Sequence, residues 1–254
     1  MIPRQFPVFS KEYEYFMEQK RLFPAKMRIL SGSVLKLIAV ITMLIDHIAS
    51  HLVPKRYVLF SVFGFDVTLY RLMRDIGRIA FPLFVFLLIE GFLHTRSRRR
   101  YGVSLLICAV ISEVPWDLVH SGDWIYSGQN VFFTLVFGFI GLCAIDSLKK
   151  HPFLACCVLI TIGVGTLFAK ADYGIFGYAF ILLMYGLRQQ ELLRPFTALL
   201  LNNHWFCMAA FVPMFMYNGK RGFIKGPVLK YAFYLFYPVH LFILFLIKYD
   251  YIRI

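Results

Sequence analysis

Charged residues are scarce in this chain, and acidic residues especially so. Only 16% of its 254 residues are charged, and 14 Asp and Glu residues stand against 27 Lys and Arg residues. The five cysteines follow no spacing typical of a disulfide framework or a zinc site, so we interpret them as thiols buried in apolar segments. Residues 1–33 contain no apolar run of the kind that a cleavable signal peptide requires. Nucleic-acid binding is disfavoured, because no basic soluble domain accompanies the positive charge.

Apolar residues dominate instead. The chain is 59% hydrophobic with a mean hydropathy of +0.68, which is typical of a polytopic membrane protein. We therefore predict an all-α, polytopic membrane helical bundle of about eight transmembrane helices. A basic, aromatic, interfacial arm is expected over residues 1–33 and a transmembrane domain over residues 34–254. The expected spans cover residues 34–53, 79–94, 102–120, 129–148, 153–169, 174–188, 195–216 and 231–248.

The distribution of Lys and Arg among the connections predicts the orientation. If the spans alternate in direction, the more basic face holds both the N-terminus and the C-terminus. We expect a multi-pass protein of the cell inner membrane with both termini in the cytoplasm. The basic segments 54–78 and 217–230 then lie on the outer face, against the rule, and are candidates for binding a ligand.

The stretch from Lys36 to His51 organises this interpretation. Asp46 and His47 lie in the second half of an apolar run of about twenty residues, where an ionisable side chain is costly unless it faces protein or water. On a helix Lys36 and His47 are about 16 Å apart and point the same way. One alternative is a helix end near the interface. Another is a metal-ligand pair of His47 and His51, for which we find no third ligand.

Further ionisable groups recur inside the expected spans, at Glu90, Glu113, His204 and His240. Two functions fit them. A transporter uses such groups as a proton or substrate relay, whereas a membrane enzyme uses His47 as a general base. Composition does not separate the two. A structural scaffold is a third reading, and it explains buried ionisable groups poorly.

Seven motifs, in order, resemble those of the TraX family, which is named for the acetylation of conjugative pilin. They are LKLIAVITMLIDHI, IGRIAFPLFVFLLIEGFLHTR, ISEVPWDL, GQNVFFTL, DYGIFGY, YNGKRG and KYAFYLFYPVHL, between about residues 33 and 245. The family is similar to the wider group of transmembrane acyltransferases, whose type-3 members carry an Arg-x10-His signature. Lys36 and His47 match that spacing, with Lys in place of Arg. The change keeps the charge and loses the bidentate fork.

The resemblance implies an acetyltransferase that takes its acyl group from acetyl-CoA. The acceptor is an amine or a hydroxyl, whether a pilin N-terminus or a cell-surface or small-molecule group, and no metal is expected. His47 would be the general base, supported by Asp46 and Asn130. Cations for the CoA phosphates would be Lys36, Arg78, Arg96, Lys220 and Arg221. Other polar residues of the site would be Glu90, Glu113, Gln129, Tyr217, Asn218 and His240.

Several roles within this set stay open. We expect Asp46 to pair with a cation on a neighbouring helix, with Arg78 as the first choice. Asn130 or Gln129 is either an oxyanion donor or a residue that satisfies a helix end.

Glu90 and Glu113 either pair with Arg96, Lys220 or Arg221, or belong to the site. His240 is either a core residue or a site residue. Arg98, Arg99 and Arg100 look like a topological anchor, and Pro115 is expected to kink or break its helix.

Overall fold

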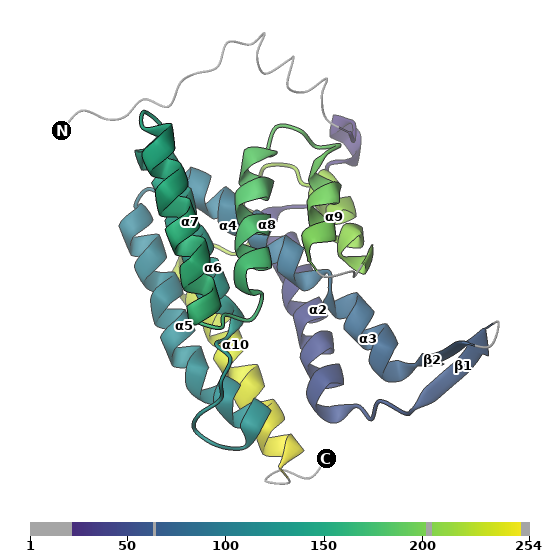
Figure 1. Ribbon diagram of the computed structural model, residues 1–254. Helices are drawn as coiled ribbons and strands as arrows, with labels where there is room; N and C mark the ends of the chain where they lie inside the picture. Colours follow the sequence, from purple (N-terminus) through teal and green to yellow (C-terminus); the bar gives the residue numbers. More distant parts are fainter. Residues whose placement is uncertain (1–21, 63–64, 202–204, 250–254) are drawn as a thin grey trace.

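The computed structural model describes residues 22–62, 65–201 and 205–249, and over these ranges it consists of packed helices with one β-hairpin (Figure 1). The all-α prediction is therefore confirmed. The α-helices are α2 (Gly32–Leu52), α3 (Leu69–Gly77), α4 (Ala80–His94), α5 (Arg98–Ser121), α6 (Val131–Ser147), α7 (Pro152–Phe168), α8 (Gly174–Gly186), α9 (Phe211–Phe215) and α10 (Gly226–Lys248). The shorter elements are η1 (Ala25–Met27), β1 (Val58–Val62), β2 (Phe65–Thr68), η2 (Arg194–Leu200) and η3 (Trp205–Ala210).

Helices long and apolar enough to cross a membrane occur four times in the described ranges. They cover Gly32–Leu52, Leu69–His94, Arg98–Ser121 and Tyr231–Lys248. Shorter apolar helices cover Val131–Ser147, Pro152–Phe168, Gly174–Gly186 and Trp205–Phe215. The expectation of about eight crossings stays a prediction, because these shorter helices fall below the length that a full crossing needs. Pro115 lies inside α5 without ending it, so the expected break does not occur.

The start of α2 is held by the loop that precedes α10. Ser31 caps the helix by accepting a hydrogen bond from the Val34 amide (3.4 Å). The carbonyl oxygens of Lys220 and Arg221 accept from the amides of Gly32 (2.8 Å) and Ser33 (2.9 Å). These amides would otherwise lack partners in the first helical turn. The loop around residue 220 therefore lies at the beginning of α2, not at the end from which segment 54–78 leaves.

The expected connection 54–78 contains regular structure. β1 and β2 pair antiparallel, and the hairpin projects away from the bundle beyond the end of α2 (Figure 1). Thr68 then caps α3 by accepting from the Arg71 amide (3.2 Å). α3 packs tightly against α2 because Gly77 has no side chain. A Cβ atom there would lie 2.3 Å from the Cβ of Asp46.

The expected seventh span does not cross the bundle. Its first part is η2 and its last part is η3 and α9; Asn202, Asn203 and His204 lie outside the described residues. Both ends of this segment lie near the start of α2. The amide of Leu22 donates to Glu191 (2.9 Å), and the amide of Leu30 donates to the carbonyl of Met216 (2.9 Å). The segment therefore enters the bundle and returns.

Because segment 195–216 returns to the end where it began, α10 runs in the opposite direction to the one that the sequence predicted. The Lys248 ammonium donates to the carbonyl of Val119 near the end of α5 (2.7 Å), and the end of α5 contacts the end of α2 through His120 and His51. Gly32 and Lys248 thus lie at opposite ends of the bundle. The expectation that both termini lie in the cytoplasm assumed a crossing at residues 195–216, which the described helices do not make, so the side of each terminus stays a prediction.

The basic residues of the described chain now gather at one end. We call it the basic end, where α2 begins. The chain before α2, the loop before α10 and the junctions α4–α5, α6–α7 and α8–η2 lie there (Figure 1), and these segments contain Lys26, Arg28, Arg96, Arg98, Arg99, Arg100, Lys149, Lys150, Arg188, Arg194, Lys220, Arg221 and Lys225. The segment from the end of α2 to the start of α3, the junction α7–α8 and the end of α10 lie at the opposite end (Figure 1), and they contain Lys55, Arg56, Arg71, Lys170 and Lys248. The excess of Lys and Arg at one end is larger than the distribution of these residues among the expected connections suggested.

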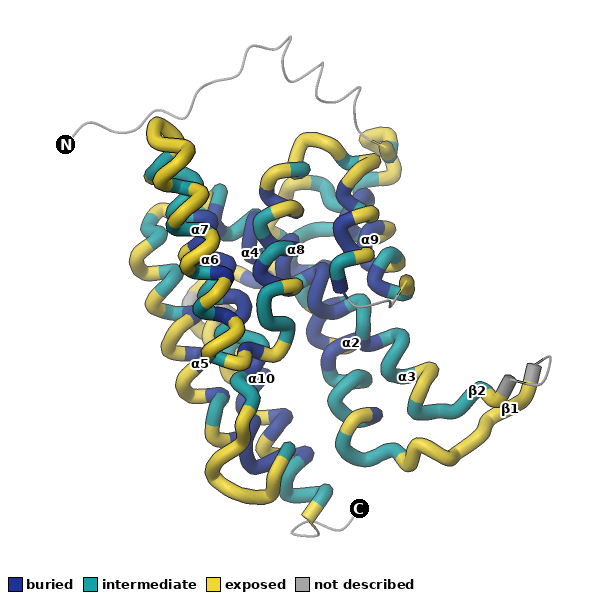
Figure 2. Tube along the Cα trace, viewed as in Figure 1, coloured by how far each residue is buried: buried dark blue, intermediate teal, exposed yellow. Residues whose placement is uncertain are grey.

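The core is centred on α4, whose side chains are buried along most of its length (Figure 2). Leu83 and Val85 are fully buried, and Phe92 packs edge-to-face against Phe139 of α6 (ring centroids 5.6 Å apart). A second cluster joins α2, α5 and α10 around Leu241. α2 lies between these two clusters, and its polar second half faces the space where they meet.

Candidate functional site

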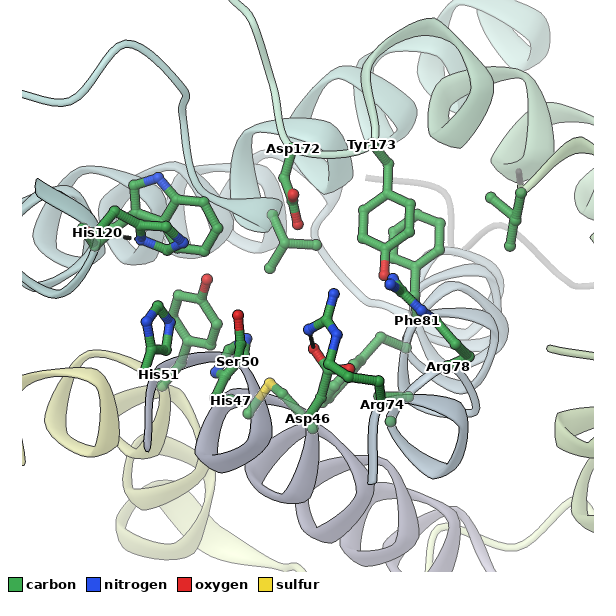
Figure 3. Close-up of a pocket in the computed structure, with 18 of the residues that line it drawn as sticks. Asp46, His47, Ser50, His51, Arg74, Arg78, Phe81, His120, Asp172 and Tyr173 are labelled. Atoms are coloured by element: carbon green, nitrogen blue, oxygen red, sulfur yellow. Dashed lines mark hydrogen bonds and ion pairs between the residues drawn. The ribbon is translucent and has the colours of Figure 1, made fainter. Parts of the chain in front are cut away.

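His47 lines a cavity of about 290 Å³ beside the second half of α2. Figure 3 shows side chains converging on it from α2, from α3 and its end, and from the segment between α7 and α8. Its polar lining residues are Asp46, His47, Ser50, His51, Arg74, Arg78, Trp116, His120, Asp172, Tyr173 and Tyr237. We call this space the histidine cavity. Most of these residues lie toward the end opposite the basic end.

Two hydrogen bonds fix the proton positions on His47 and His240. His240 Nδ1 lies 2.8 Å from the carbonyl oxygen of Phe236, and because a carbonyl only accepts, this nitrogen carries the hydrogen of the neutral ring. His240 Nε2 then has a lone pair, and it lies 2.7 Å from His47 Nδ1. His47 therefore donates from Nδ1, which leaves Nε2 with a lone pair. That tautomer is the form that a general base requires.

Tyr237 supplies a hydroxyl beside this histidine pair. Its ring makes edge contacts with His47 (centroids 6.0 Å apart) and His240 (5.4 Å apart), and only 2% of the residue is exposed. The hydroxyl oxygen faces the backbone amide of Val131, whereas its hydrogen meets no acceptor among the described residues. The cavity thus contains a buried donor next to the candidate base.

Asp46 pairs with Arg74, not with Arg78 as expected. Arg74 Nη1 lies 2.5 Å from Asp46 Oδ2, with both side chains largely buried. The close packing at Gly77 brings α3 alongside α2, so that Arg74 reaches the carboxylate. Arg78 follows α3 and lines the same cavity without an ion pair to Asp46. Arg74 was not predicted as a site residue, because the sequence pattern did not indicate a helix over residues 69–77.

Asp172 and Tyr173 form the opposite wall, ahead of α8. Figure 3 shows Asp172 pointing into the cavity, and the Tyr173 ring stacks on Phe81 (centroids 3.7 Å apart). Asp172 keeps exposed surface toward the cavity, and the protein around the cavity lowers its hydration. This loss of hydration and the Asp46 carboxylate raise the pKa of Asp172 to about 6, against the opposing effect of the arginines. Asp172 therefore changes charge near physiological pH.

The remaining histidines of the cavity do not form a metal site. His51 contacts His120 edge-to-face (centroids 4.8 Å apart) and lies 6.3 Å from His47 by the same measure. Over the described ranges, no three His, Cys, Asp or Glu side chains are arranged to hold a metal ion. The alternative that paired His47 with His51 as ligands finds no third ligand there.

A second cavity, of about 790 Å³, lies at the basic end. Its cationic lining residues are Lys36, Arg96, Arg100 and Arg221. We call it the basic cavity. Three of the predicted phosphate-binding residues are therefore brought together. Lys220 is exposed at its edge, and its carbonyl holds the amide of Gly32.

Two cations line other cavities than the sequence analysis expected. Arg78 belongs to the histidine cavity, because α3 ends beside the second half of α2. Arg100 lines the basic cavity instead of serving only as an anchor. Arg98 is different again, since it pairs with Asp146 of α6 and covers the ring of Phe92.

A third, narrower cavity of about 110 Å³ lies between the other two. Lys36 lines both it and the basic cavity, and Phe84 lines both it and the histidine cavity. Its other lining residues are mostly apolar and include Leu88 and Phe132. We call it the apolar cavity. The three spaces therefore follow one another along α2, from Lys36 to His47.

Glu90, Tyr217 and Asn218 belong to the basic end. The Tyr217 hydroxyl donates to Glu90, and lost hydration together with this carboxylate raises the pKa of Tyr217 to about 12. Glu90 Oε2 also lies 3.6 Å from His94 Nε2. Asn218 ties the loop to the chain before α2, since its amide nitrogen donates to the carbonyl of Ile29 (3.3 Å). These groups shape the wall around the cations.

Asn130, Gln129 and Glu113 lie outside the histidine cavity. Asn130 is fully buried and caps α6 by accepting from the Phe132 amide (3.0 Å). Its amide nitrogen donates to Ala109 and Glu113, so both of its hydrogens are used. The predicted catalytic role of Asn130 is therefore wrong, and the helix-end reading holds. Glu113 pairs with Asn130 rather than with a cation, and Gln129 pairs through its backbone with the segment at Lys170.

The fold and these cavities define a multi-pass helical membrane protein with a polar site inside the bundle. The chain belongs to the TraX protein family, which matches residues 31–248. It is similar to the "Probable fimbrial assembly protein FimC, serogroup H1" of Dichelobacter nodosus. The two are 32% identical over 241 residues, which is 83% of this chain and 93% of that protein. No solved structure matches the chain.

Proposed function

We propose that this protein is an inner-membrane acetyltransferase that moves an acetyl group from acetyl-CoA to an amine or hydroxyl acceptor. The basic cavity would hold the nucleotide end of the donor, and His47 would act where the donor meets the acceptor. The basic end would face the cytoplasm, where acetyl-CoA is made, because Lys and Arg are enriched on that side of membrane proteins. The acceptor would enter the histidine cavity from the opposite end.

The observation that carries this proposal is the row of three cavities along α2. A donor with several phosphates needs fixed cations, which the basic cavity offers in Lys36, Arg96 and Arg221. The apolar cavity suits a thin, uncharged arm that leads inward from Lys36. The spacing of about 16 Å between Lys36 and His47 is comparable with the reach of a pantetheine arm.

The chemistry follows from the tautomer of His47. With its hydrogen on Nδ1 and held by His240, the imidazole accepts the acceptor's proton at Nε2 as the acceptor attacks the thioester carbon. A C–N or C–O bond forms and the C–S bond breaks. The imidazolium then returns the proton to the departing sulfur.

The other cavity residues would stabilise charge during this step. The free hydrogen of the Tyr237 hydroxyl suits negative charge that develops on the thioester oxygen. The pair of Asp46 and Arg74 fixes the wall beside His47 without providing the base. Asp172 faces the cavity from the acceptor side and would interact with an incoming polar group.

The relative's printed name suggests the kind of acceptor. Because the relative is named a probable fimbrial assembly protein, a pilin N-terminus is our first candidate, and a cell-surface sugar or a small amine is the second. An acceptor on the outer side fits the position of the histidine cavity near the end opposite the basic end.

The test is transfer of label from acetyl-CoA by the purified protein in nanodiscs, with a membrane extract as the source of acceptors. We expect incorporation with the wild type and none with His47→Ala, while CoA still raises the thermal stability of both. Stabilisation by CoA without any incorporation would count against a transferase. Flux of a solute without any stabilisation by CoA would favour a transporter.

A further inference from the structure

The described residues of the β1–β2 hairpin are exposed on both sides, and their main contact with the helices is where β2 leads into α3. Exposure is 59% at Tyr57, 44% at Val58 and 53% at Phe60. Large apolar side chains left in water in such numbers indicate a surface that something covers. The hairpin leaves the bundle directly after α2, a candidate membrane span, and at the end opposite the basic end (Figure 2).

Two neighbouring residue pairs of the hairpin differ in polarity, and they lie beyond the irregularity that follows the Val58–Thr68 pair. Phe60 pairs with Val67, and the next pair is Ser61 with Asp66. Because successive side chains of a strand point to opposite faces, Phe60 and Val67 share one face and the other pair lies on the reverse. There Ser61 Oγ donates to Asp66 Oδ1 (2.5 Å). At these two pairs, one face is therefore suited to lipid and the other to water.

Basic and aromatic residues surround the base of the hairpin. Lys55, Arg56 and Arg71 are exposed there, and the Lys55 ammonium lies 5.7 Å from the centre of the Tyr70 ring. Tyrosines are typical of the membrane–water interface, and exposed cations there bind anionic headgroups. An amphipathic element that is flanked by basic and aromatic residues is suited to lying in the plane of the membrane–water interface.

We propose that the hairpin rests on the bilayer as a lateral anchor, with Phe60 and Val67 toward the acyl chains and Lys55, Arg56 and Arg71 on anionic phospholipid headgroups. The anchor holds the start of α3 at a fixed depth. α3 carries Arg74, and the anchor thereby supports one wall of the histidine cavity. The proposal stands independently of acetyl transfer.

The experiment compares two adjacent positions. In full-length protein carrying Trp124→Phe and Trp205→Phe, with the buried Trp116 as a constant background, a new tryptophan is placed by Phe60→Trp or by Ser61→Trp. Each variant is put into nanodiscs of phosphatidylcholine and phosphatidylglycerol with brominated acyl chains. We expect bromine to quench the tryptophan of Phe60→Trp about twofold or more strongly than that of Ser61→Trp, and aqueous iodide to do the reverse.

A second pair on the partner strand, Val67→Trp against Asp66→Trp, repeats the comparison from β2 and should behave in the same way. Removing phosphatidylglycerol should weaken the bromine quenching of Phe60→Trp, and Lys55→Gln with Arg56→Gln should abolish this dependence on lipid charge. Equal bromine quenching of both faces, or none at either apolar position, would overturn the proposal. The latter result would point to a protein partner or to water instead.

Discussion

His47 Nδ1 lies 2.7 Å from His240 Nε2, although 193 residues separate the two histidines in the chain. The contact joins α2 to α10, and the Phe236 carbonyl behind His240 determines its direction. Under the proposed function the pair would work as a base with an orienting partner, in which a neutral imidazole takes the place of a carboxylate.

The first prediction separates the orienting role of His240 from simple packing. His240→Gln keeps an acceptor oxygen for His47 Nδ1–H, whereas His240→Leu fills similar space without one. We expect the Leu variant to lose about 100-fold or more in kcat and the Gln variant to recover much of the loss, because a well-placed general base contributes roughly that much. KM for acetyl-CoA should not change. Equal activity of the two variants would contradict the assignment of the tautomer.

The second prediction concerns the basic cavity. Arg96→Ala and Arg221→Ala should each weaken CoA binding, because both guanidinium groups line that cavity. Arg99→Ala is the matched control, since Arg99 is exposed at the same end and does not line the cavity. The measurement is the shift of the melting midpoint with CoA concentration. Similar losses in all three variants would argue for a general surface effect.

The third prediction tests the packing of α3 on α2. Gly77→Ala introduces a methyl group into the space of Asp46, so it should cost about 1–3 kcal/mol and disturb the Asp46–Arg74 ion pair. Gly186→Ala is the control, because nothing lies within 4 Å of a Cβ at that position. Thermal unfolding in detergent measures both. A Gly77→Ala variant as stable as Gly186→Ala would mean that the two helices separate freely.

Long apolar runs allowed the sequence to predict the helices around α2, α4, α5 and α10, since their length and composition are decisive. The segment 195–216 is equally apolar, yet it returns to its starting end. Hydropathy does not tell whether an apolar segment crosses the bundle or turns back within it. The predicted direction of α10 was therefore wrong. The sequence analysis did not predict the hairpin or α3, because short runs of apolar residues alternate with arginines over residues 54–78.

Within the site, His47 was predictable because an imidazole inside an apolar span is costly. Its neighbours were harder to find. Arg74 depends on the unexpected α3, and Asp172 lies on a connection too short to suggest a role. Tyr237 stood in the YPVH motif, where i, i+3 spacing to His240 was the available signal. Asn130 was predicted as a possible oxyanion donor, but in the structure its side chain caps α6.

The fourth prediction is a pH dependence that comes from Asp172. Its pKa rises from 3.8 to about 6 on folding, so the folded protein holds a proton that the unfolded chain has already lost. The stability contributed by this group is therefore present at low pH and decreases as the pH rises through about 6. Relative to Asp172→Asn, the wild type should lose thermal stability between about pH 4 and pH 6 and then level off. A constant difference over that range would exclude the effect.

The most direct test of the central claim is the sidedness of transfer in membrane vesicles. Labelled acetyl-CoA is added outside inverted inner-membrane vesicles, which expose the cytoplasmic face, and outside right-side-out vesicles. The account predicts label in protease-protected, lumenal material of the inverted vesicles, none with right-side-out vesicles, and none with His47→Ala in either. Label that appears only with right-side-out vesicles, or that persists in His47→Ala, would contradict it.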